Sequence, residues 1–551
     1  MRTTITLLFY LLSTWLVGQS DLFNQNITYS RQDSLRGSIT PERAWWDLKH
    51  YDLKVAVDIK HQSIKGTNTI TYEVLEKGNQ FQIDLQAPMQ IIEVKQDGET
   101  LQVVDEGSAH FIQLQKNQTP GDRITLEISF EGVPRVAANA PWDGGFTWVT
   151  DSNGKPFVAT SNQGIGASIW WPCKDHGYDE PDEGLLLSIT VPDSLVAVGN
   201  GRLHDTIEQE DTKTFVWKVI NPINNYGVNI NIGDYVHFSE VFSGENGPLD
   251  LDYWVLRENL EKAKAQFKQV PMTIEAFEYW FGPYPFYEDG YKLVEVPYLG
   301  MEHQSSVTYG NSYKNGYNGR GRGSFDWSGT GIGLQWDYII VHETGHEWFA
   351  NNITVKDVAD LWVHEGFTAY SESLYTEYHF GKDKGTAYSL GTRRVIANQS
   401  PLVGDYQVNK EGSSDMYFKG NNILHTARQI INDDQKWRSI LRGLNKEFYH
   451  STVTTDQIET YISEKAGIDL SSYFDQYLRT PNIPELEIER AGKAIKYRWT
   501  NVIDDFAMPL DVSIDKTNLR LMVTSSWQKV KGKDLKVNPN YYIKMKEISS
   551  D

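Results

Sequence analysis

The segment YIIVHETGHEWFANNITVKDVADLWVHEGFTAYSE, residues 338–372, carries two histidines that bracket a glutamate. On an α-helix, positions i and i+4 lie on one face, so His342 and His346 can direct their imidazoles at a single ion. Glu343 projects beside them, next to one ligand but off the ligating face. The pattern therefore predicts a helix that carries part of a metal site.

A third ligand is available within the same segment. Tetrahedral catalytic zinc sites use three protein ligands and keep one position open for water. Glu365 follows nineteen residues after His346, and Leu361, Trp362 and Phe367 around it have helical spacing, so we expect a second helix packed against the first. Each residue alone is more often an ordinary surface group than a ligand. Together, His342, His346 and Glu365 predict a site for one zinc ion.

A bound zinc ion would give Glu343 a chemical task. Zinc polarises carbonyl groups and lowers the pKa of bound water toward ~7. Glu343 could then take the proton of that water and return it to a leaving amine as a general base. The alternative, a surface glutamate that forms a salt bridge, is weak once the metal is granted.

The chain before this segment has the texture of an all-β domain. From Tyr51, apolar Leu53, Val55 and Val57 alternate with polar residues, which is the period of a half-buried strand. Similar stretches, such as GTNTITYEV and DRITLEISF, continue to about residue 240. Strands separated by Gly, Asn and Asp turns are therefore expected over the first third.

After this region the pattern becomes helical and then returns to strands. The stretch from Glu258 has helical spacing with Pro271 breaking it, and Thr455 is a plausible helix cap further on. The sequence predicts a multidomain α+β fold. Its expected boundaries are a signal peptide over 1–20, a β domain over 21–245, a zinc peptidase domain over 246–483 and a β-rich module over 484–551.

Composition limits the function. The 551 residues are 40% hydrophobic, enough for several cores, and the net charge is −21 without a basic run. The negative charge and the lack of a basic run argue against binding to the phosphates of a nucleic acid, so no nucleic acid partner is expected.

The first residues indicate export. MRTTITLLFYLLSTWLVGQS has an early arginine, a short apolar stretch and small residues after it, as cleaved secretory signals do. The apolar stretch is too short for a comfortable membrane span, so we expect no stable membrane insertion after cleavage and a periplasmic or extracellular location. Cys173 is the single cysteine, which leaves no internal disulfide.

Several motifs resemble one family. HETGHEWFANNIT and LWVHEGF are similar to the zinc-binding segment of the gluzincin aminopeptidases, the family of aminopeptidase N and leukotriene hydrolase. HYDLKVAVDI, WWPCKD, FGPYPF and FDQYLRTPNIPELEIE resemble further elements of that family in the expected order. The resemblance implies a saddle-shaped β domain, a thermolysin-like catalytic domain, and hydrolysis of the N-terminal bond of peptides with a free N-terminus.

The resemblance also implies roles for further residues. DMYFKGNNIL matches the segment whose tyrosine stabilises the oxyanion, here Tyr417. YLGMEHQSS matches the motif that binds the substrate amine, which assigns Gly300, Met301 and Glu302. Gln163 stands where the leukotriene hydrolase branch has an amine-contacting glutamine. From the residues alone, Tyr417 would be a packing residue and Gln163 a turn residue.

Some features depart from the family pattern. His303 and His364 replace asparagines, as partners of the ligands or as polar fillers. The Gly-rich segment 310–333 is an insertion that either shapes the first side-chain pocket or acts as a connector. Two other functions stay open: epoxide opening at the same zinc site, and peptide binding without catalysis on this fold.

Overall fold

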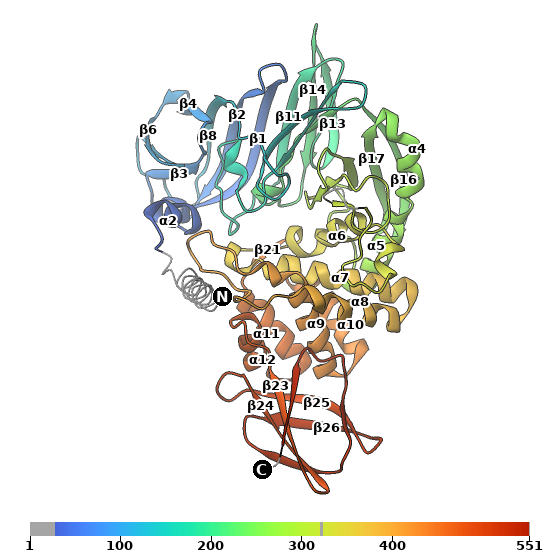
Figure 1. Cartoon of the computed structure of the whole chain (residues 1–551). Coiled ribbons are helices and arrows are strands. Elements are labelled where there is room, and N and C mark those ends of the chain that lie inside the picture. Colours follow the sequence, from blue (N-terminus) through green and yellow to red (C-terminus); the bar gives the residue numbers. More distant parts are fainter. Residues whose placement is uncertain (1–27, 320–322, 550–551) are drawn as a thin grey trace, which may run out of the picture.

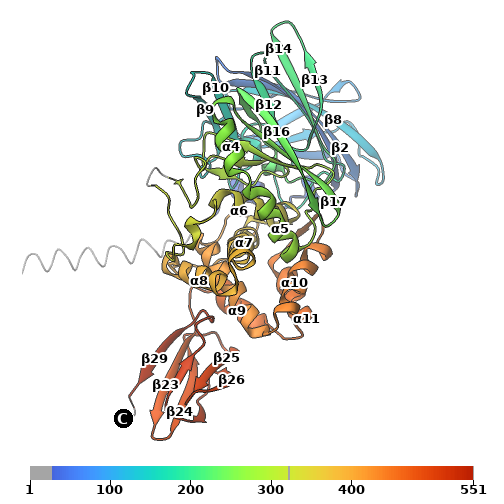
Figure 2. The ribbon, with the colours of Figure 1, turned by 90° about the vertical axis from the view of Figure 1, so that its right-hand side faces the viewer.

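The computed structural model describes residues 28–319 and 323–549, which form three parts in chain order (Figure 1). A β domain, blue to green, is stacked on a helical domain in yellow and orange. A smaller β module, red, extends from the other side of the helical domain, as Figure 2 shows from a second direction. This arrangement confirms the predicted multidomain α+β fold.

Strand β1 (Trp46–Asp58) lies inside the largest sheet and confirms the first predicted strand. Leu53, Val55 and Val57 are buried, while Lys54 and Asp58, at positions that point to the other face, are exposed. β1 pairs antiparallel with β2 (Ser63–Val74) and parallel with β11 (Leu185–Pro192). The alternation of apolar and polar residues therefore sets which face of the sheet is covered.

The β domain contains three sheets among its described residues. Their orders are β13-β14-β11-β1-β2-β8-β4-β5, β12-β15-β10-β9 and β3-β7-β6. The two N-terminal helices are α2 (Arg31–Gly37) and α3 (Pro41–Ala44). The remaining strands are β3 (Gln80–Asp84), β4 (Gln90–Gln96), β5 (Glu99–Thr100), β6 (Gln102–Glu106), β7 (Ala109–Gln113), β8 (Arg123–Gly132), β9 (Gly145–Thr150), β10 (Pro156–Ser161), β12 (Val196–Val198), β13 (Arg202–Glu208), β14 (Thr212–Val219) and β15 (Asn231–Gly233).

A five-stranded sheet opens the helical domain. Its order is β16-β17-β18-β20-β19, with β16 (Tyr235–Gly244), β17 (Gly247–Leu256), β18 (Tyr291–Glu295), β19 (Gly300–Met301) and β20 (Val307–Tyr309). The predicted boundary at residue 245 falls in the turn of the β16–β17 hairpin. Because β16 belongs to the same sheet as β19, we propose that the catalytic domain begins near Tyr235 instead.

Among the described residues of the helical domain, two α-helices come between β17 and β18 in the chain, and the others follow β20. They are α4 (Leu260–Gln266), α5 (Gln269–Phe281), α6 (Tyr338–Gly345), α7 (Trp362–Phe380), α8 (Lys382–Thr392), α9 (Phe418–Ile431), α10 (Asp434–Glu447), α11 (Thr455–Ala466) and α12 (Ser471–Leu478), with the short strands β21 (Ile353–Val355) and β22 (Ser451–Val453). The break between α4 and α5 precedes Pro271, which sits in the first turn of α5. Proline is tolerated there because its missing N–H has no helical partner.

The predicted cap of α11 was wrong by one residue. Thr454, and not Thr455, is the N-cap, and its side chain accepts a hydrogen bond from the backbone N–H of Gln457. The Gln457 side chain in turn accepts from the Thr454 N–H at 2.9 Å. The threonine that stands three residues before a glutamine completes this capping box, and Thr455 does not.

Close packing of α7 on α9 joins two parts of the cavity described below. A Cβ added at Gly420 would lie 2.6 Å from the Cα of Gly366, so the helices can approach this closely only with glycine at both positions. Glu365 precedes Gly366, and Tyr417 lies shortly before Gly420 at the start of α9. The glycine contact therefore holds Glu365 and Tyr417 on neighbouring elements.

The C-terminal module is a sandwich of two small sheets with orders β27-β24-β23-β29 and β26-β25-β28. It docks below α9, where the Tyr542 N–H donates to Thr426 at 3.0 Å. Its strands are β23 (Glu485–Ala491), β24 (Ala494–Thr500), β25 (Ala507–Ile514), β26 (Thr517–Thr524), β27 (Gln528–Lys531), β28 (Leu535–Val537) and β29 (Lys544–Ile548).

Candidate active site

One large cavity of 1230 Å³ opens between the β domain and the helical domain. All residues that the sequence nominated for the site line it: Gln163, Gly300, Met301, Glu302, His342, Glu343, His346, Glu365 and Tyr417. These residues come from segments that are far apart in the chain. The fold therefore brings them to one place.

Helix α6 positions the two histidines. Asp337 caps the helix by accepting hydrogen bonds from the N–H groups of Ile339 and Ile340. The helix ends at Gly345, one residue before His346. His346 nevertheless keeps helical dihedrals of −66° and −18° as the C-cap, so both imidazoles remain on one face.

The chain after His346 is strained in a way that serves the site. A π-turn over Glu347–Asn351 is interrupted at Ala350, which has a φ of 145°. This conformation is costly for a residue with a side chain. The turn presents the Phe349 carbonyl oxygen to His346 Nδ1 at 3.0 Å, so the kink fixes the orientation of the second imidazole.

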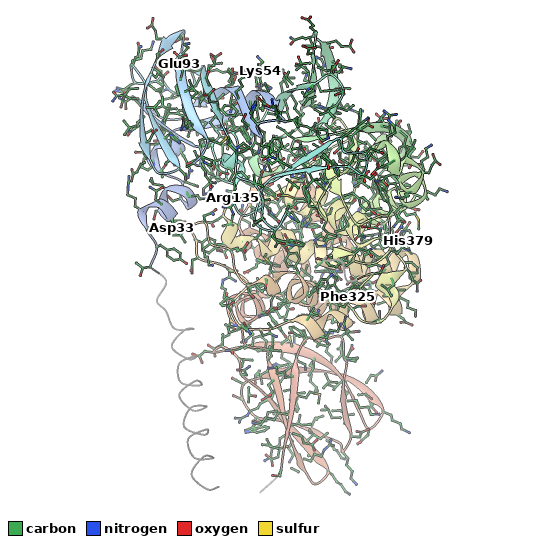
Figure 3. The ribbon with its side chains drawn as sticks, turned by 45° about the horizontal axis from the view of Figure 1, so that its top comes forward. Asp33, Lys54, Glu93, Arg135, Phe325 and His379 are labelled. Atoms are coloured by element: carbon green, nitrogen blue, oxygen red, sulfur yellow. The ribbon has the colours of Figure 1, made fainter. Side chains whose placement is uncertain are left out.

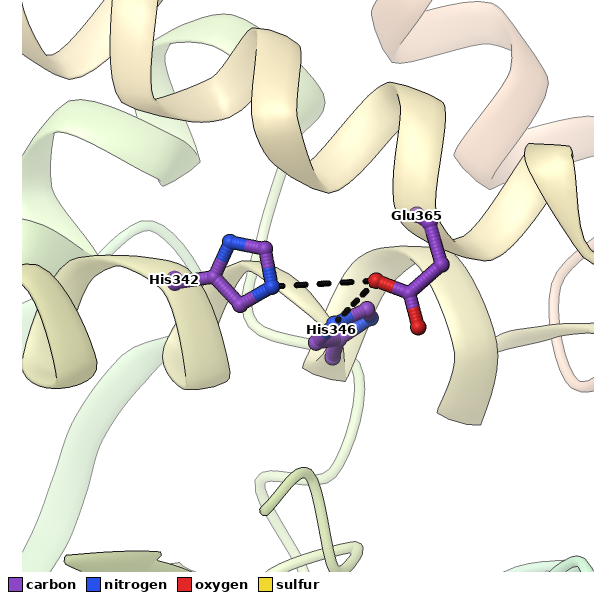
Figure 4. Close-up of side chains that lie close together, drawn as sticks. All are labelled: His342, His346 and Glu365. Carbon is purple, nitrogen blue, oxygen red and sulfur yellow. Dashed lines mark ion pairs between the residues drawn. The ribbon is translucent and has the colours of Figure 1, made fainter. Parts of the chain in front are cut away.

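Glu365 completes a compact set of ligand atoms. It lies in the first turn of α7, and its Oε2 is 3.7 Å from His342 Nε2 and 3.4 Å from His346 Nε2 (Figure 4). The three ligand atoms all lie within 4.8 Å of one another. The three side chains converge from two packed helices, as their spacing in the sequence predicts.

Oxygen atoms behind the imidazoles select their tautomer. His342 Nδ1 lies 2.7 Å from Glu372 Oε1, and Phe349 O faces Nδ1 of His346. An acceptor on Nδ1 keeps the proton there and leaves Nε2 free to bind a cation. Glu372 was missed in the sequence, although it lies two turns after Glu365 on the same face of α7, a spacing that could have identified it.

The set fits a divalent cation. Glu365 Oε2 is buried and has no hydrogen-bond partner among the described residues, which is costly unless another group binds it. Burial acts to raise the pKa of Glu365, but the facing imidazoles of His346 and His342 outweigh it and lower that pKa below its ordinary value. Two imidazole nitrogens and one carboxylate oxygen are the ligands that zinc accepts.

Glu343 is placed for proton transfer. Its carboxylate is buried beside the histidines, and its Oε1 lies 3.2 Å from the position that a Cβ on Gly300 would take. Burial raises the pKa of Glu343 to about 7, although His342 and His346 oppose the shift. A carboxylate with such a pKa can both accept and release a proton near neutral pH.

Glu302 and Gln163 form a polar end of the cavity next to the ligands. Gln163 Nε2 donates to Glu302 Oε1 at 2.7 Å and to Glu365 Oε1 at 2.9 Å. The ligand atoms of Glu302, Glu343 and His346 also lie within 4.8 Å of one another. Burial raises the pKa of Glu302. A buried carboxylate of this kind is stabilised by a cationic group such as an ammonium.

Gly300 and Met301 contribute to the site through their backbone, not through their side chains. They form β19, which is the last strand of its sheet and pairs only with β20 among the described residues. A Cβ on Gly300 would lie 2.6 Å from Ile339 Cγ2, so glycine allows α6 to approach the strand. The open edge of β19 can therefore pair with an extended peptide that lies along α6.

Tyr417 lines the cavity next to His342. Its ring stacks on His342 with centroids 6.0 Å apart, and it stands at the start of α9. Burial raises the pKa of Tyr417, and the carboxylates of Glu365 and Glu302 add to the shift. The hydroxyl therefore stays protonated and can donate a hydrogen bond.

The two unusual histidines have structural contacts. His364 Nε2 accepts from the Val355 N–H at 2.9 Å, and His303 Nδ1 lies 3.4 Å from the Thr308 hydroxyl. Burial lowers the pKa of each imidazole to about 3, so both are neutral. These contacts favour the interpretation as polar fillers that hold β21 and β20.

Comparisons with known proteins agree with this geometry. Residues 332–477 match the model described as the peptidase family M1 domain, and residues 48–226 match the peptidase M1 N-terminal domain. Mouse (Mus musculus) aminopeptidase B is 27% identical over 397 residues, which is 66% of this chain and 55% of that protein. Probable aminopeptidase 1 of Sulfurisphaera tokodaii is 22% identical over 83% of this chain and 58% of its own length.

The chain thus spans little more than half the length of these relatives. A solved structure with the same fold is a variant of an M1 zinc metallopeptidase from Deinococcus radiodurans bound to a Tyr-Ser-Ala substrate. It has a TM-score of 0.68 and 20% identity, and the match covers 81% of this chain and 98% of that one. With both family domains matched in order around one converged site, the chain belongs to peptidase family M1.

Proposed function

We propose that this protein is a zinc-dependent aminopeptidase that removes the N-terminal residue of peptides. The observation that carries the proposal is the hydrogen-bonded pair of Gln163 and Glu302, which places a carboxylate next to the three ligand atoms. A carboxylate there can bind a free α-amine, while the carbonyl group of the same residue, whose carbon is two bonds from the amine nitrogen, reaches the ligand atoms. The relatives named aminopeptidase support this substrate class.

We infer that His342, His346 and Glu365 hold one zinc ion. Three observations support this choice: the nitrogen and oxygen atoms that converge, the acceptors on both Nδ1 atoms, and Glu365 Oε2, which has no hydrogen-bond partner among the described residues. When bound, zinc supplies Lewis acidity, which polarises a carbonyl group and acidifies water.

The chain's own groups would do the remaining work. Glu302 and Gln163 bind the substrate amine, and the open edge of β19 orients the peptide. Glu343 accepts a proton from the attacking water and returns it to the leaving nitrogen. The Tyr417 hydroxyl donates a hydrogen bond to the oxygen that becomes negative as the carbonyl is attacked. No feature of the described cavity favours an epoxide over a peptide.

A panel of aminoacyl reporter substrates tests this function. We expect release of the N-terminal residue from free substrates, no release from N-acetylated ones, and at least about a 100-fold loss after chelation that zinc restores. Release rates and zinc content measured on the same samples check the result. A zinc-loaded protein that leaves every free peptide intact would refute the proposal.

Removal of the carboxylate behind His342 is expected to weaken metal binding. In Glu372→Ala, the imidazole loses the acceptor of its Nδ1 proton, and such losses typically cost about 10–100-fold in affinity. Competition with a chromophoric chelator measures the zinc dissociation constant. Glu377→Ala, on the same helix but paired with Arg428, is the matched control and should bind zinc as the wild type does. Equal losses in both variants would assign the effect to α7 as a whole.

We also infer that the protein is exported to the periplasm or the exterior. Support comes from the signal-like pattern of residues 1–20, which lie outside the described residues. Across residues 28–319 and 323–549, no helix is long and apolar enough to span a membrane. Cleavage of the precursor between residues 18 and 23, detected by mass spectrometry of the mature protein, would test the inference.

A further inference from the structure

Three aromatic side chains of the Gly-rich segment form one wall of the cavity. We call Tyr317, Phe325 and Trp327 the aromatic wall. The Trp327 ring lies 5.2 Å from the Tyr317 ring and 5.0 Å from the Phe325 ring, and all three line the cavity. Phe325, labelled in Figure 3, is 42% exposed, which is unusual for a phenylalanine inside a cluster of rings.

The aromatic wall is a fixed part of the fold. Tyr317 and Phe325 exchange two backbone hydrogen bonds of 2.9 Å. The Arg394 guanidinium donates to the carbonyl oxygens of Asp326 and Trp327 at 2.7 Å and 3.0 Å. These contacts hold the rings of the aromatic wall in place. An apolar surface kept rigid and open to the cavity is suited to bind a side chain.

The aromatic wall stands at the opposite end of α6 from Glu302. The carboxylate of Glu302 lies near His346, at the C-terminal end of the helix. The Tyr317 ring instead contacts Tyr338, the first residue of α6, with centroids 5.4 Å apart. His342 lies one turn after Tyr338 and therefore between the two ends. The ligand atoms thus separate the amine-binding end of the cavity from the wall.

The order of Glu302, the ligand atoms and the aromatic wall along α6 indicates which residue of a bound peptide would contact the wall. A peptide whose amine is held by Glu302, and whose first carbonyl reaches the ligands, continues past Ile339 toward Tyr338. The residue that meets the wall is therefore the second residue of the peptide, on the leaving side of the scissile bond. The sequence left two roles open for this segment, the first side-chain pocket or a connector, and the position of the rings indicates the next pocket instead.

We propose that the aromatic wall binds the second residue of the substrate and favours a large apolar side chain there. The proposal rests on the proposed aminopeptidase function. Ile339 and Leu299 line the cavity as well and add apolar surface. Burial of an apolar side chain against these groups stabilises only substrates that carry one.

Two peptides that differ in the second residue test the proposal. We expect the wild-type protein to cleave Ala-Phe-Ala with a kcat/KM at least about tenfold above that for Ala-Gly-Ala. In Phe325→Ala, this preference should fall by about five- to tenfold, while kcat/KM for Ala-Gly-Ala stays within about twofold. Phe325→Leu should restore part of the preference. Because Phe325 is half-exposed, neither change should disturb folding.

Trp142→Ala is the matched control. Trp142 is also aromatic, exposed to 48% and part of the cavity lining, but it belongs to the β domain. It lies two residues before Gly144, where an added Cβ would meet Cγ2 of Ile165, and Ile165 is two residues after Gln163. Its removal should leave the ratio between the two peptides unchanged. An unchanged ratio in Phe325→Ala, or an equal fall in Trp142→Ala, would overturn the proposal. Failure of the wild type to cleave either peptide would instead refute the aminopeptidase function.

Discussion

Glu343→Gln is expected to lower kcat/KM for free peptides by about 10²–10⁴-fold while zinc binding is retained. The amide has nearly the shape of the carboxylate but cannot accept a proton at neutral pH. Glu343 lies next to a ligand and over Gly300, where the scissile bond passes in the proposed mode of binding. The loss should appear in kcat, because the contacts that bind the amine are unchanged.

Zinc content, the unfolding temperature and kinetics of the same preparation check this result. One zinc per chain and a wild-type unfolding profile show that the ligands are in place. Glu411→Gln is a suitable control, since Glu411 is another carboxylate in the cavity lining but lies on the 409–414 segment. It should keep kcat for an alanyl substrate within about threefold of the wild type. Turnover by Glu343→Gln at more than a tenth of the wild-type rate would exclude Glu343 as the general base.

The sequence predicts best those site residues whose positions follow from the geometry of a single helix. His342 and His346 depend on a spacing of four residues, and Glu365 follows on the next helix, so helical periodicity was sufficient. Glu372 obeys the same rule, two turns after Glu365, so its spacing could have nominated it, but that spacing does not show which ligand it contacts. The outer partner of His342 therefore needed coordinates.

Other features depend on contacts that no local pattern encodes. The backbone at Ala350 departs from helical dihedrals, although the sequence around it gives no sign of a break. This turn brings Phe349 O to His346 Nδ1. The placement of Tyr417 beside Glu365 requires the contact of Gly366 with Gly420, two glycines on separate helices. In the sequence, only the resemblance to a family singled out Tyr417, since propensity gives no reason for it.

The fold, too, contains features that local sequence patterns predict and features that depend on contacts between distant segments. The strand over residues 51–60 could be predicted, since one face of β1 is buried and the alternation is visible. The membership of β16 in the sheet of β17 and β18 could not be predicted, because β16 has the same alternating texture as the strands before it. What assigns β16 to the catalytic sheet is its pairing with β17, a choice of neighbour that composition does not reveal.

Glu302→Ala is expected to lower kcat/KM for peptides with a free α-amine by about 10²–10³-fold, with little change in zinc affinity. Truncating one partner of a buried, hydrogen-bonded charge pair costs about 2–5 kcal/mol, and each 1.4 kcal/mol is a factor of ten. Glu302 is 2% exposed and accepts from Gln163, so water cannot replace it as the counter-ion of the amine.

A pair of substrates isolates this contribution of Glu302. Alanyl and propionyl derivatives of the same reporter differ only in the α-amine. The wild type should prefer the alanyl form strongly, and Glu302→Ala should lose most of that preference while it cleaves the propionyl form at a similar or higher rate. A loss of activity on the alanyl reporter alone cannot come from a damaged metal site, because such damage would slow cleavage of both reporters. If zinc is lost together with activity on both reporters, Glu302 holds the site together and the amine is bound elsewhere.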